Sequence, residues 1–302
     1  MEALEYGPAY KYDLPLLVKV AYFDIDNTLV PNDSPDLPSG EFCRLAQAAG
    51  NSITIALATA RSLQRTIHII DAIDPKGISV LSNGAVMYDA VKKEIIADYS
   101  IPLDIATAVI GWLHKNHMSY EIQDDGVDFR WTFETSKLKQ LDMIGVYNTS
   151  ENPLYPSGQR IMRSDYTLTK PRIIAVELHD QQSLKSVTDY ILGLSGNGIT
   201  SLLGHTTYHD DGSITYEVFI VNIHANKKDA LRRALQLQGI DKSNAMAVID
   251  GYNDLSVFES TAINVAVSNA VQPVLDKAVF IAPSMAQNGA AIALKALVID
   301  LT

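Results

Sequence analysis

Hydrophobic and polar positions change their period along the chain, and the change separates its two ends from its middle. Near the N-terminus, short apolar runs typical of buried parallel strands alternate with segments of helical spacing. The strands are predicted over 18–23, 52–58 and 78–81, and the helices over 39–50 and 62–73. Alternation of strand and helix predicts a doubly wound parallel sheet.

The middle of the chain has a different pattern. A hairpin is predicted over 86–99, followed by helices near 104–116 and 181–193 and by a strand over 172–178. From 225 the first pattern returns, with helices over 227–238, 253–259 and 289–298 and strands over 245–249 and 263–267. The predicted fold class is therefore α/β: a Rossmann-like, doubly wound parallel-sheet core formed by 1–85 and 222–302, with an α+β cap domain inserted over 86–221.

Composition and charge indicate which kinds of binding partner, such as nucleic acids or membranes, are not expected. Of the 302 residues, 24 are Lys or Arg and 35 are Asp or Glu, for a net charge of −11. Because phosphate contacts need clustered basic residues, no nucleic-acid partner is expected. No apolar run approaches the ~18 residues of a membrane span, so no membrane partner is expected. The acidic N-terminus and the single Cys43 favour a cytoplasmic location. No particular oligomeric state is predicted.

Two aspartates follow the first apolar run, in "VAYFDIDNTLV". Residues i and i+2 of extended chain point the same way, so Asp24 and Asp26 are expected to face one site while Ile25 points inward. Like charges this close need a cation or a shared proton, and Mg²⁺ prefers oxygen ligands. A helix cap or an Asx turn is the alternative interpretation.

Other predicted strand ends carry complementary groups. Thr59 follows "ITIALA", Lys227 begins a helix in "NKKDAL", and Asp250 and Asp254 follow "AMAVI" in "DGYND". An N-cap role for Thr59 and a tight turn at "DGYND" are the plainer alternatives. In an open α/β sheet, ligands bind at the carboxyl ends of the strands. Two acidic pairs, a hydroxyl and a lysine at that edge suit phosphoryl transfer through an aspartyl phosphate.

These segments resemble the motifs of a known superfamily. "DIDNTL" resembles the first motif of the haloacid dehalogenase (HAD) superfamily, "TAR" the second, Lys227 the third and "DGYND" the fourth. "SNGA" at 82–85 resembles the stretch before the cap, and "VAVSNA" and "QNGAAIAL" resemble closing segments. The chain is thus similar to Cof-type HAD phosphatases, which carry a large cap inserted after the third strand.

The resemblance implies roles for the residues of these motifs. Asp24 would be the nucleophile, and Asp26 would protonate the leaving group and then activate water. Thr59 and Lys227 would hold the phosphoryl oxygens. Mg²⁺ would be the cofactor, bound by Asp24, the main-chain carbonyl of Asp26, and Asp250.

Further residues have less direct roles in the resemblance. Asp254 would contribute to the metal site through water or orient its neighbours. Asn253 would contact phosphate or support the site, and Asn83 is a candidate substrate contact. The chain departs from the family pattern at Ala60 and Ile249, where glycine is usual and the backbone is freer.

The leading functional hypothesis is a Mg²⁺-dependent phosphatase acting on a small phosphorylated metabolite such as a sugar phosphate. A phosphomutase of the same superfamily and a non-catalytic phosphometabolite-binding protein are the alternatives. His205 and His209, with Asp210 and Asp211, suggest either a metal cluster or a polar loop between cap strands. This loop or the segment 124–134 is expected to contact the leaving group of the substrate, and substitutions in 120–134 or 203–212 are expected to change substrate preference.

Overall fold

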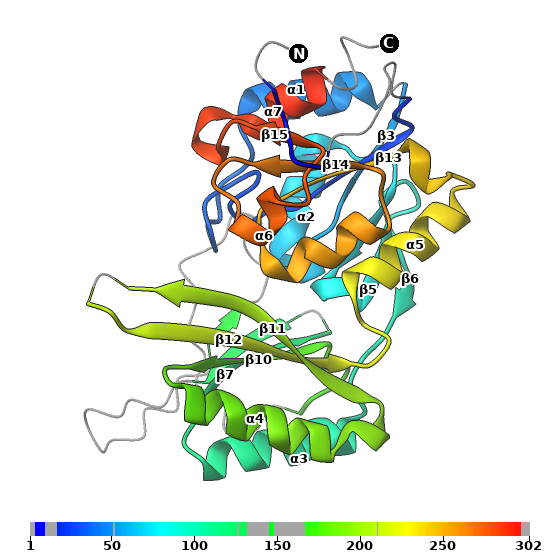
Figure 1. Cartoon of the computed structure of the whole chain (residues 1–302). Helices are drawn as coiled ribbons and strands as arrows, with labels where there is room; N and C mark the ends of the chain where they lie inside the picture. Colours follow the sequence, from blue (N-terminus) through cyan, green and yellow to red (C-terminus); the bar gives the residue numbers. More distant parts are fainter. Residues whose placement is uncertain are drawn as a thin grey trace. The chain divides into compact units, whose positions relative to one another are not determined.

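A computed structural model gives the structure of the chain and describes residues 4–9, 17–50, 52–125, 127–131, 145–147, 167–209 and 211–296 (Figure 1). The chain is divided into two compact units. The first comprises Met1–Arg61, Thr66–Asp98 and Asn226–Thr302, and the second comprises Ser62–Arg65 and Tyr99–Ala225. Among the described residues, no sheet contains strands of both units.

The sheet of the first unit has the strand order β1-β15-β14-β13-β2-β3 among the described residues. Its strands are β1 (Glu5–Tyr6), β2 (Val20–Phe23), β3 (Thr54–Leu57), β13 (Ala245–Ile249), β14 (Ile263–Val267) and β15 (Phe280–Ala282). All neighbours are parallel except β1, which pairs antiparallel with β15. Residues of β2 and β13 are buried throughout, as expected of central parallel strands.

The chain reverses its direction of winding between β2 and β13. From β2 it proceeds outward to β3, and the later segments β13, β14 and β15 extend from the other side of β2. This is the topological switch point at which open α/β sheets bind ligands, outside the carboxyl ends of the strands. Asp24 and Asp250 directly follow the two strands that flank it.

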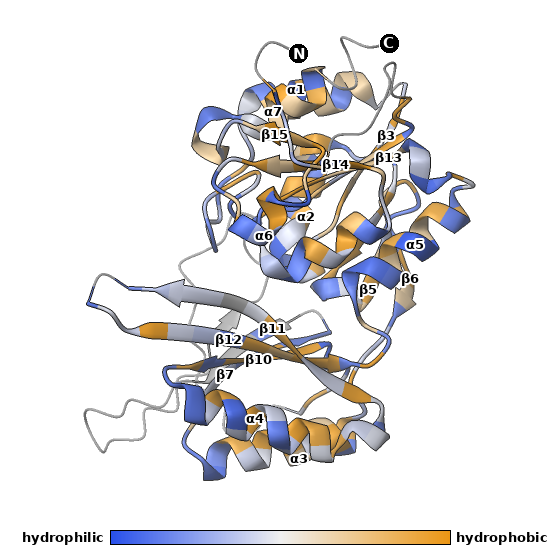
Figure 2. Ribbon diagram, in the orientation of Figure 1, coloured by the Kyte–Doolittle hydropathy of each residue, from blue (hydrophilic) through white to orange (hydrophobic). Residues whose placement is uncertain are grey.

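The helices of the first unit lie along this sheet with their apolar sides inward (Figure 2). They are α1 (Gly40–Ala49), α2 (Leu63–Ile73), α5 (Lys227–Leu237), α6 (Gln272–Leu275) and α7 (Gly289–Leu294). Short 3₁₀ turns are η1 (Ser82–Gly84), η3 (Lys242–Asn244), η4 (Tyr252–Glu259) and η5 (Met285–Gln287). Ser39 and Asn226 cap α1 and α5, because each side chain accepts a hydrogen bond from the first helical turn.

A second small sheet joins this unit. β4 (Ile78–Leu81) pairs with β5 (Val86–Asp89), which pairs with β6 (Glu94–Asp98). β4 also lies beside β3 through a bridge between Ala58 and Val80. The hairpin of β5 and β6 therefore belongs to the first unit, whereas the sequence predicts that the inserted domain begins at 86. The physical reason is the backbone pairing with β4.

The second unit is an antiparallel sheet with helices on one face (Figure 1). Its strands follow the order β11 (Ile199–Tyr208), β12 (Ile214–Asn222), β10 (Ile173–Leu178), β7 (Ser119–Asp124), β8 (Val127–Trp131) and β9 (Gly145–Tyr147). The helices are α3 (Leu103–Lys115) and α4 (Gln181–Gly193), with the turn η2 (Ser195–Asn197). Val109, Val187 and Ile220 lie in its buried core, and Trp112 stacks on Tyr190 with ring centroids 4.3 Å apart.

The predicted fold class is confirmed: an α/β core with a parallel sheet and a separate α+β unit. The predicted helix over 253–259 is a 3₁₀ segment, η4. β1 has no counterpart in the sequence analysis, because two residues are too few to show a period.

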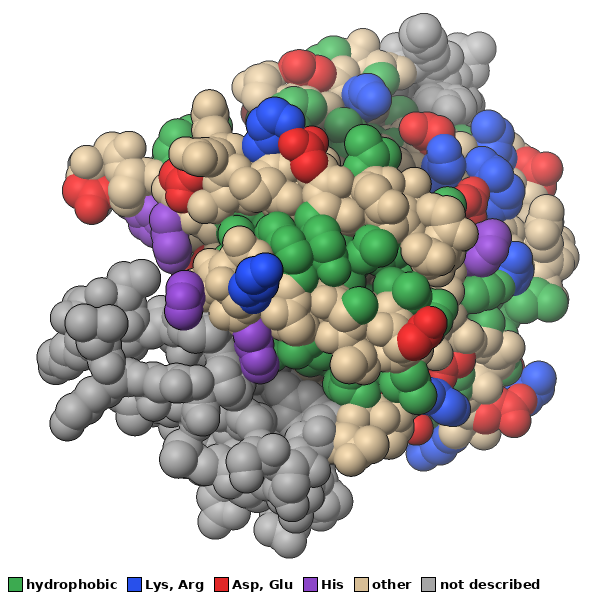
Figure 3. Space-filling view, turned by 90° about the horizontal axis from the view of Figure 1, so that it is seen from below, with side chains coloured by type: hydrophobic (Ala, Val, Ile, Leu, Met, Phe, Trp, Pro, Cys, Tyr) green, Lys and Arg blue, Asp and Glu red, His purple; other side chains and the backbone are tan. Residues whose placement is uncertain are grey.

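Surface charge and helix composition are the features relevant to nucleic-acid and membrane partners. On the face shown in Figure 3, Lys and Arg side chains of the described residues are dispersed among acidic and uncharged ones. The described part of the chain contains no helix with the length and apolar character that crossing a membrane requires.

Candidate active site

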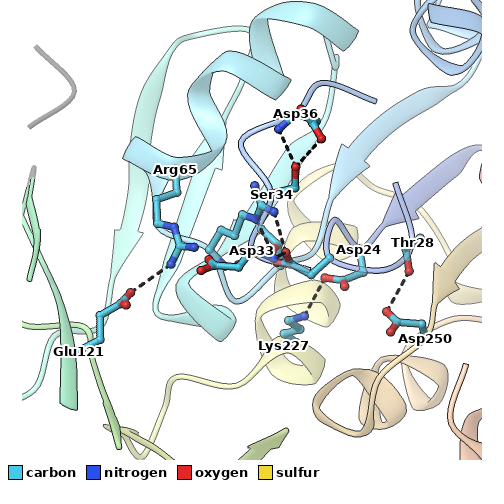
Figure 4. A network of polar contacts seen from close by, with 12 residues as sticks. Asp24, Thr28, Asp33, Ser34, Asp36, Arg65, Glu121, Lys227 and Asp250 are labelled. Carbon is cyan, nitrogen blue, oxygen red and sulfur yellow. Dashed lines mark hydrogen bonds and ion pairs between the residues drawn. The ribbon is translucent and has the colours of Figure 1, made fainter. Parts of the chain in front are cut away.

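Asp24 lies at the carboxyl end of β2, where the parallel sheet holds its backbone. Its N–H donates to the carbonyl of Val248 in the neighbouring strand at 3.0 Å. Lys227, the first residue of α5, donates from Nζ to Oδ1 of Asp24 at 3.1 Å (Figure 4). Both side chains are buried, so a lysine and an aspartate 203 positions apart form an ion pair inside the protein.

Two further carboxylates complete this cluster. Oxygen atoms of Asp24, Asp250 and Asp254 all lie within 4.8 Å of one another. Asp250 Oδ1 accepts a hydrogen bond from Thr28 Oγ1 at 3.0 Å (Figure 4), and Asp254 Oδ1 accepts one from Lys227. Asp254 Oδ2 is buried without a hydrogen-bond partner among the described residues. The cluster therefore has three carboxylates, one lysine and an unused buried acceptor.

Burial and mutual repulsion govern protonation in the cluster. Burial, followed by repulsion from Asp254, raises the pKa of Asp24 and raises the pKa of Asp250 to about 7. Burial also raises the pKa of Asp254, against the attraction of Lys227. Burial alone would lower the pKa of Lys227, but Asp24 and Asp254 raise it. The lysine is thus a fixed cation, and three ionised carboxylates would have more negative charge than it alone can neutralise.

The cluster fits a hard divalent cation. Mg²⁺ takes oxygen ligands and is held in proteins by few carboxylates. Convergent oxygens from three buried aspartates, one of which has an oxygen unpartnered within the described ranges, provide such a donor set. Among the described residues, no other group of His, Cys, Asp or Glu side chains has this geometry.

Asp26 lies in the same loop as Asp24, but its carboxylate has different partners. Arg61 donates from Nη2 to Oδ1 at 2.6 Å and from Nε to Oδ2 at 3.0 Å. The backbone N–H of Asp33 also donates to Oδ1, at 2.7 Å. The Asp26 side chain is 25% exposed, in contrast to the buried cluster. Asp24 and Asp26 therefore belong to one site but differ in environment.

Thr59, a predicted phosphate contact, and Asn83, a predicted substrate contact, come from the loops after β3 and β4. Thr59 is buried; its Oγ1 accepts from the Arg61 N–H at 3.1 Å, and its carbonyl accepts from the Asn83 N–H at 3.0 Å. Ser82 and Asn83 have positive φ angles of 47° and 53°. Such angles are costly for residues other than glycine and cluster at functional sites. Asn83 Oδ1 is buried with no partner among the described residues.

The remaining motif positions differ in backbone conformation, and Asn27 of the first motif has a positive φ of 55°. Asn253 is half-buried in η4, and a Cβ at Gly251 would meet its Oδ1 at 2.6 Å. Neither Ala60 nor Ile249 is among the described residues with positive φ. The backbone freedom of the glycine usual at these two positions is thus not used here.

Three residues without a role in the sequence analysis contribute to the site. Thr28 binds Asp250, and Arg61 binds Asp26. Gly84 has φ +96°, and a Cβ there would lie 2.3 Å from the carbonyl carbon of Asn226, so it lets η1 approach the start of α5. Thr28 lies two positions after Asp26 in the first motif, and Arg61 lies two positions after Thr59 in the second, and these places were the available signal. Nothing local to Gly84 indicates its contact 142 positions away, from 84 to 226.

Of the two histidines singled out in the second unit, His205 lies in β11, paired with Glu217 of β12, and His209 lies in the turn between these strands. His209 Nε2 is 2.8 Å from Thr215 Oγ1, and Asp211 accepts hydrogen bonds from Ser213. These contacts are those of a polar hairpin loop. Asp210 lies outside the described residues, as do 126 and 132–134 of the segment 124–134.

A family model and several known proteins are similar to this chain. A family model described as haloacid dehalogenase-like hydrolase matches residues 21–294. The Bacillus subtilis (strain 168) protein YxeH is 23% identical over 290 residues, covering 94% of this chain and 99% of its own. The 5-amino-6-(5-phospho-D-ribitylamino)uracil phosphatase YwtE of the same organism is 22% identical over 279 residues, covering 91% and 96%.

Solved structures share the fold. The HAD subclass IIB sugar phosphatase BT4131 superposes with a TM-score of 0.67 at 18% sequence identity. The superposition covers 94% of this chain and 100% of that one. The likeness therefore extends over both units.

Proposed function

We propose that this chain, which belongs to the haloacid dehalogenase-like hydrolases of the Cof-type group and is a phosphatase, hydrolyses a small phosphorylated metabolite. The reaction proceeds through an aspartyl phosphate on Asp24, with Mg²⁺ as cofactor. The observation that carries this proposal is the buried cluster at the end of β2. There Lys227 lies 3.1 Å from Asp24, and oxygens of Asp24, Asp250 and Asp254 lie within 4.8 Å of one another.

In the first step, a carboxylate oxygen of Asp24 attacks phosphorus and forms the new O–P bond. The bond from phosphorus to the leaving oxygen breaks, and Asp26 transfers a proton to that oxygen. Lys227 and Thr59 hold the phosphoryl oxygens and offset their charge. The buried side of the cluster fixes Asp24, because its neighbours are held by the sheet and by α5.

In the second step, Asp26 accepts a proton from water, and the water oxygen attacks phosphorus. The O–P bond to Asp24 breaks, which releases inorganic phosphate and restores the Asp24 carboxylate. Asp26 gives up a proton in the first step and regains one in the second, so it ends the cycle protonated as it began. Its partial exposure is consistent with exchange of protons with water, whereas Asp24 is buried.

Asp24, Asp250 and Asp254 would hold Mg²⁺ together with the main-chain carbonyl of Asp26. The ion would supply positive charge that offsets the repulsion between these carboxylates and the phosphoryl group. Asn253 in η4 would support this region, next to Gly251.

The substrate class that the relatives support is a phosphorylated sugar or polyol. The names of the similar proteins specify a sugar phosphatase and a phosphoribitylamino-uracil phosphatase. Asn83 is the proposed contact for the leaving group, because its buried Oδ1 has no partner in the described part of the chain and its backbone is strained. The protein is proposed to act in the cytoplasm, without nucleic acid.

The test is phosphate release from a panel of sugar and polyol phosphates and p-nitrophenyl phosphate, with purified protein in Mg²⁺ or in excess EDTA. We expect release that stops in EDTA and returns with Mg²⁺, and ³²P label on Asp24 after acid quench. Full activity after rigorous metal removal would contradict the metal assignment. Transfer of the phosphoryl group back to the substrate, without net release, would favour a phosphomutase.

A further inference from the structure

The bidentate contact between Arg61 and Asp26 has no part in the two proposed steps of phosphate hydrolysis. A buried arginine is costly unless its charge is neutralised, and the Arg61 side chain is only 2% exposed. Its Nε and Nη2 contact different oxygens of Asp26, at 3.0 and 2.6 Å. A planar guanidinium that binds both oxygens of a carboxylate fixes its rotation as well as its position.

Arg61 is itself held from both sides by the loops of the site. Its N–H donates to Thr59 Oγ1 at 3.1 Å, and its carbonyl accepts from the Ser82 N–H at 2.8 Å. The backbone of Arg61 therefore connects the loop after β3 with the loop after β4. An aspartate side chain on a partly exposed loop would otherwise rotate about two torsions. Arg61 transmits the rigidity of the two loops to that side chain.

The hydrogen bonds also distinguish the two oxygens of Asp26. Each carboxylate oxygen has about two lone-pair sites. Oδ1 accepts from Arg61 Nη2 and from the Asp33 N–H at 2.7 Å, so both of its sites are used. Oδ2 accepts only from Arg61 Nε among the contacts of the described residues, which leaves it one site.

We propose that Arg61 is a positioning residue, which orients the Asp26 carboxylate so that Oδ2 is the oxygen that exchanges the proton with the leaving group and with water. This inference rests on the proposed function, because it assumes that Asp26 is the acid and base. It adds the residue that sets the direction of proton transfer. Arg61 need not touch the substrate for this role.

The test is the first-turnover rate of Arg61→Lys, by rapid quench, with an alkyl phosphate and with p-nitrophenyl phosphate. Lysine keeps the positive charge but cannot bind both oxygens in a fixed plane. An alkoxide leaving group needs a proton and nitrophenolate hardly does. General acid catalysis is worth roughly 10²–10⁴-fold, so misdirection should slow the alkyl substrate about 10–100-fold. The aryl substrate should change less than about 3-fold.

Arg232→Lys is the matched control, since Arg232 forms an exposed ion pair with Asp229. It should leave both rates unchanged. A double-mutant cycle sharpens the test: in an Asp26→Ala background, Arg61→Lys should cause no further loss with the alkyl phosphate. Equal slowing of both substrates, or effects that add to those of Asp26→Ala, would overturn the positioning role. A rise in KM alone would instead indicate that Arg61 binds the substrate, through its buried Nη1.

Two further measurements keep the inference testable if Arg61→Lys does not fold. Arg61→Gln is read by the same ratio of rates. In the wild-type protein, the Nε–H proton of Arg61 should be protected from exchange with solvent. Its NMR resonance should shift when the partly exposed Asp26 is replaced in Asp26→Ala. A resonance that does not respond would refute the contact. If wild-type protein hydrolyses neither substrate, the proposed function fails; if it hydrolyses both and the ratio is unchanged in the variants, only the positioning role fails.

Discussion

Asp124 of the second unit and the aspartate cluster of the first unit are both buried, but their hydrogen bonds differ. In the second unit, the Asp124 carboxylate at the end of β7 accepts hydrogen bonds from the N–H of Asp125, Thr169 and Lys170 and from the Thr169 hydroxyl. In the first unit, Asp24 and Asp254 share the donor Lys227, and an oxygen of Asp254 remains unpartnered within the described ranges.

The difference indicates what each group is for. A buried carboxylate saturated by backbone N–H groups stabilises the chain, because it satisfies donors that would otherwise be orphaned. Asp124 thereby fixes the segment before β10, where Arg172 also pairs with Asp125 at 2.8 Å. Carboxylates that compete for one lysine repel one another, as is expected of the proposed site for a cation and a phosphoryl group.

The largest expected effect is on activity. Asp24→Asn should reduce first-turnover phosphate transfer by at least on the order of 10³-fold, because an amide is a poor nucleophile. Asp124→Asn, the same chemical change in the second unit, should leave the rate within about 3-fold when assayed well below its melting temperature. Rapid-quench kinetics on both variants checks this. Comparable losses would show that the two carboxylates are not different in kind.

The second-largest expected difference between the aspartate cluster and Asp124 is in metal binding. Mg²⁺ should raise the melting temperature of the wild-type protein, with a stabilisation of about 2.7 kcal/mol at a hundredfold excess over Kd. Asp250→Asn should remove most of this shift, whereas Asp124→Asn should retain it. Differential scanning fluorimetry with MgCl₂, against NaCl at equal ionic strength, measures both. An undiminished shift in Asp250→Asn would contradict the cation site.

In the absence of metal, the free energy of unfolding should depend strongly on Asp124, which has no expected role in activity or metal binding. Asp124→Asn should lower the free energy of unfolding by about 1–3 kcal/mol, because an amide nitrogen replaces an acceptor that faces buried donors. Asp189→Asn, at an exposed ion pair of α4, is the control and should change it by less than about 0.5 kcal/mol. Urea unfolding measures both values. Equal midpoints for the two variants would refute the structural role of Asp124.

The smallest effect concerns repulsion inside the cluster. Asp254→Asn should stabilise the metal-free protein by no more than about 1 kcal/mol, because lost repulsion is partly offset by lost attraction to Lys227. Burial raises the pKa of Asp254, so the native state holds a proton that the unfolded chain loses as pH rises. The cost of ionising it is present at high pH and absent at low pH.

The stabilisation by Asp254→Asn should therefore be larger at pH 8 than at pH 5. Melting temperatures in EDTA across this range measure it, and Asp276→Asn, at an exposed position, serves as the control. A stabilisation that grew towards low pH would contradict the sign of the pKa shift.

The sequence predicted the core well for an identifiable reason. The strands of the first unit are short, continuous apolar runs, and β2, β4, β13 and β14 lie within a few residues of their predicted positions. Asp24 and Asp250 follow these runs directly, so their place at one edge of the sheet could be inferred. The phosphatase superfamily could be recognised from the same motifs.

Other features lay beyond sequence patterns. The hairpin of β5 and β6 reads as the start of a new domain, yet its backbone pairs with β4. β1 is too short to show a period, and its pairing with β15 needs Gly7, where a Cβ would lie 2.2 Å from the carbonyl oxygen of Ala278. Pairing partners distant along the chain leave no local signal.

By itself, then, the sequence determined which residue types stand at the strand ends, because side-chain alternation and apolar runs are local properties. Only the tertiary structure decided how those residues are paired. Asp24 and Asp26 are two positions apart and are the same residue type, yet one is buried with Lys227 and the other is held by Arg61. The physical reason is that hydrogen-bond and charge partners come from α5 and from the loop after β3, and the folded chain alone brings them together.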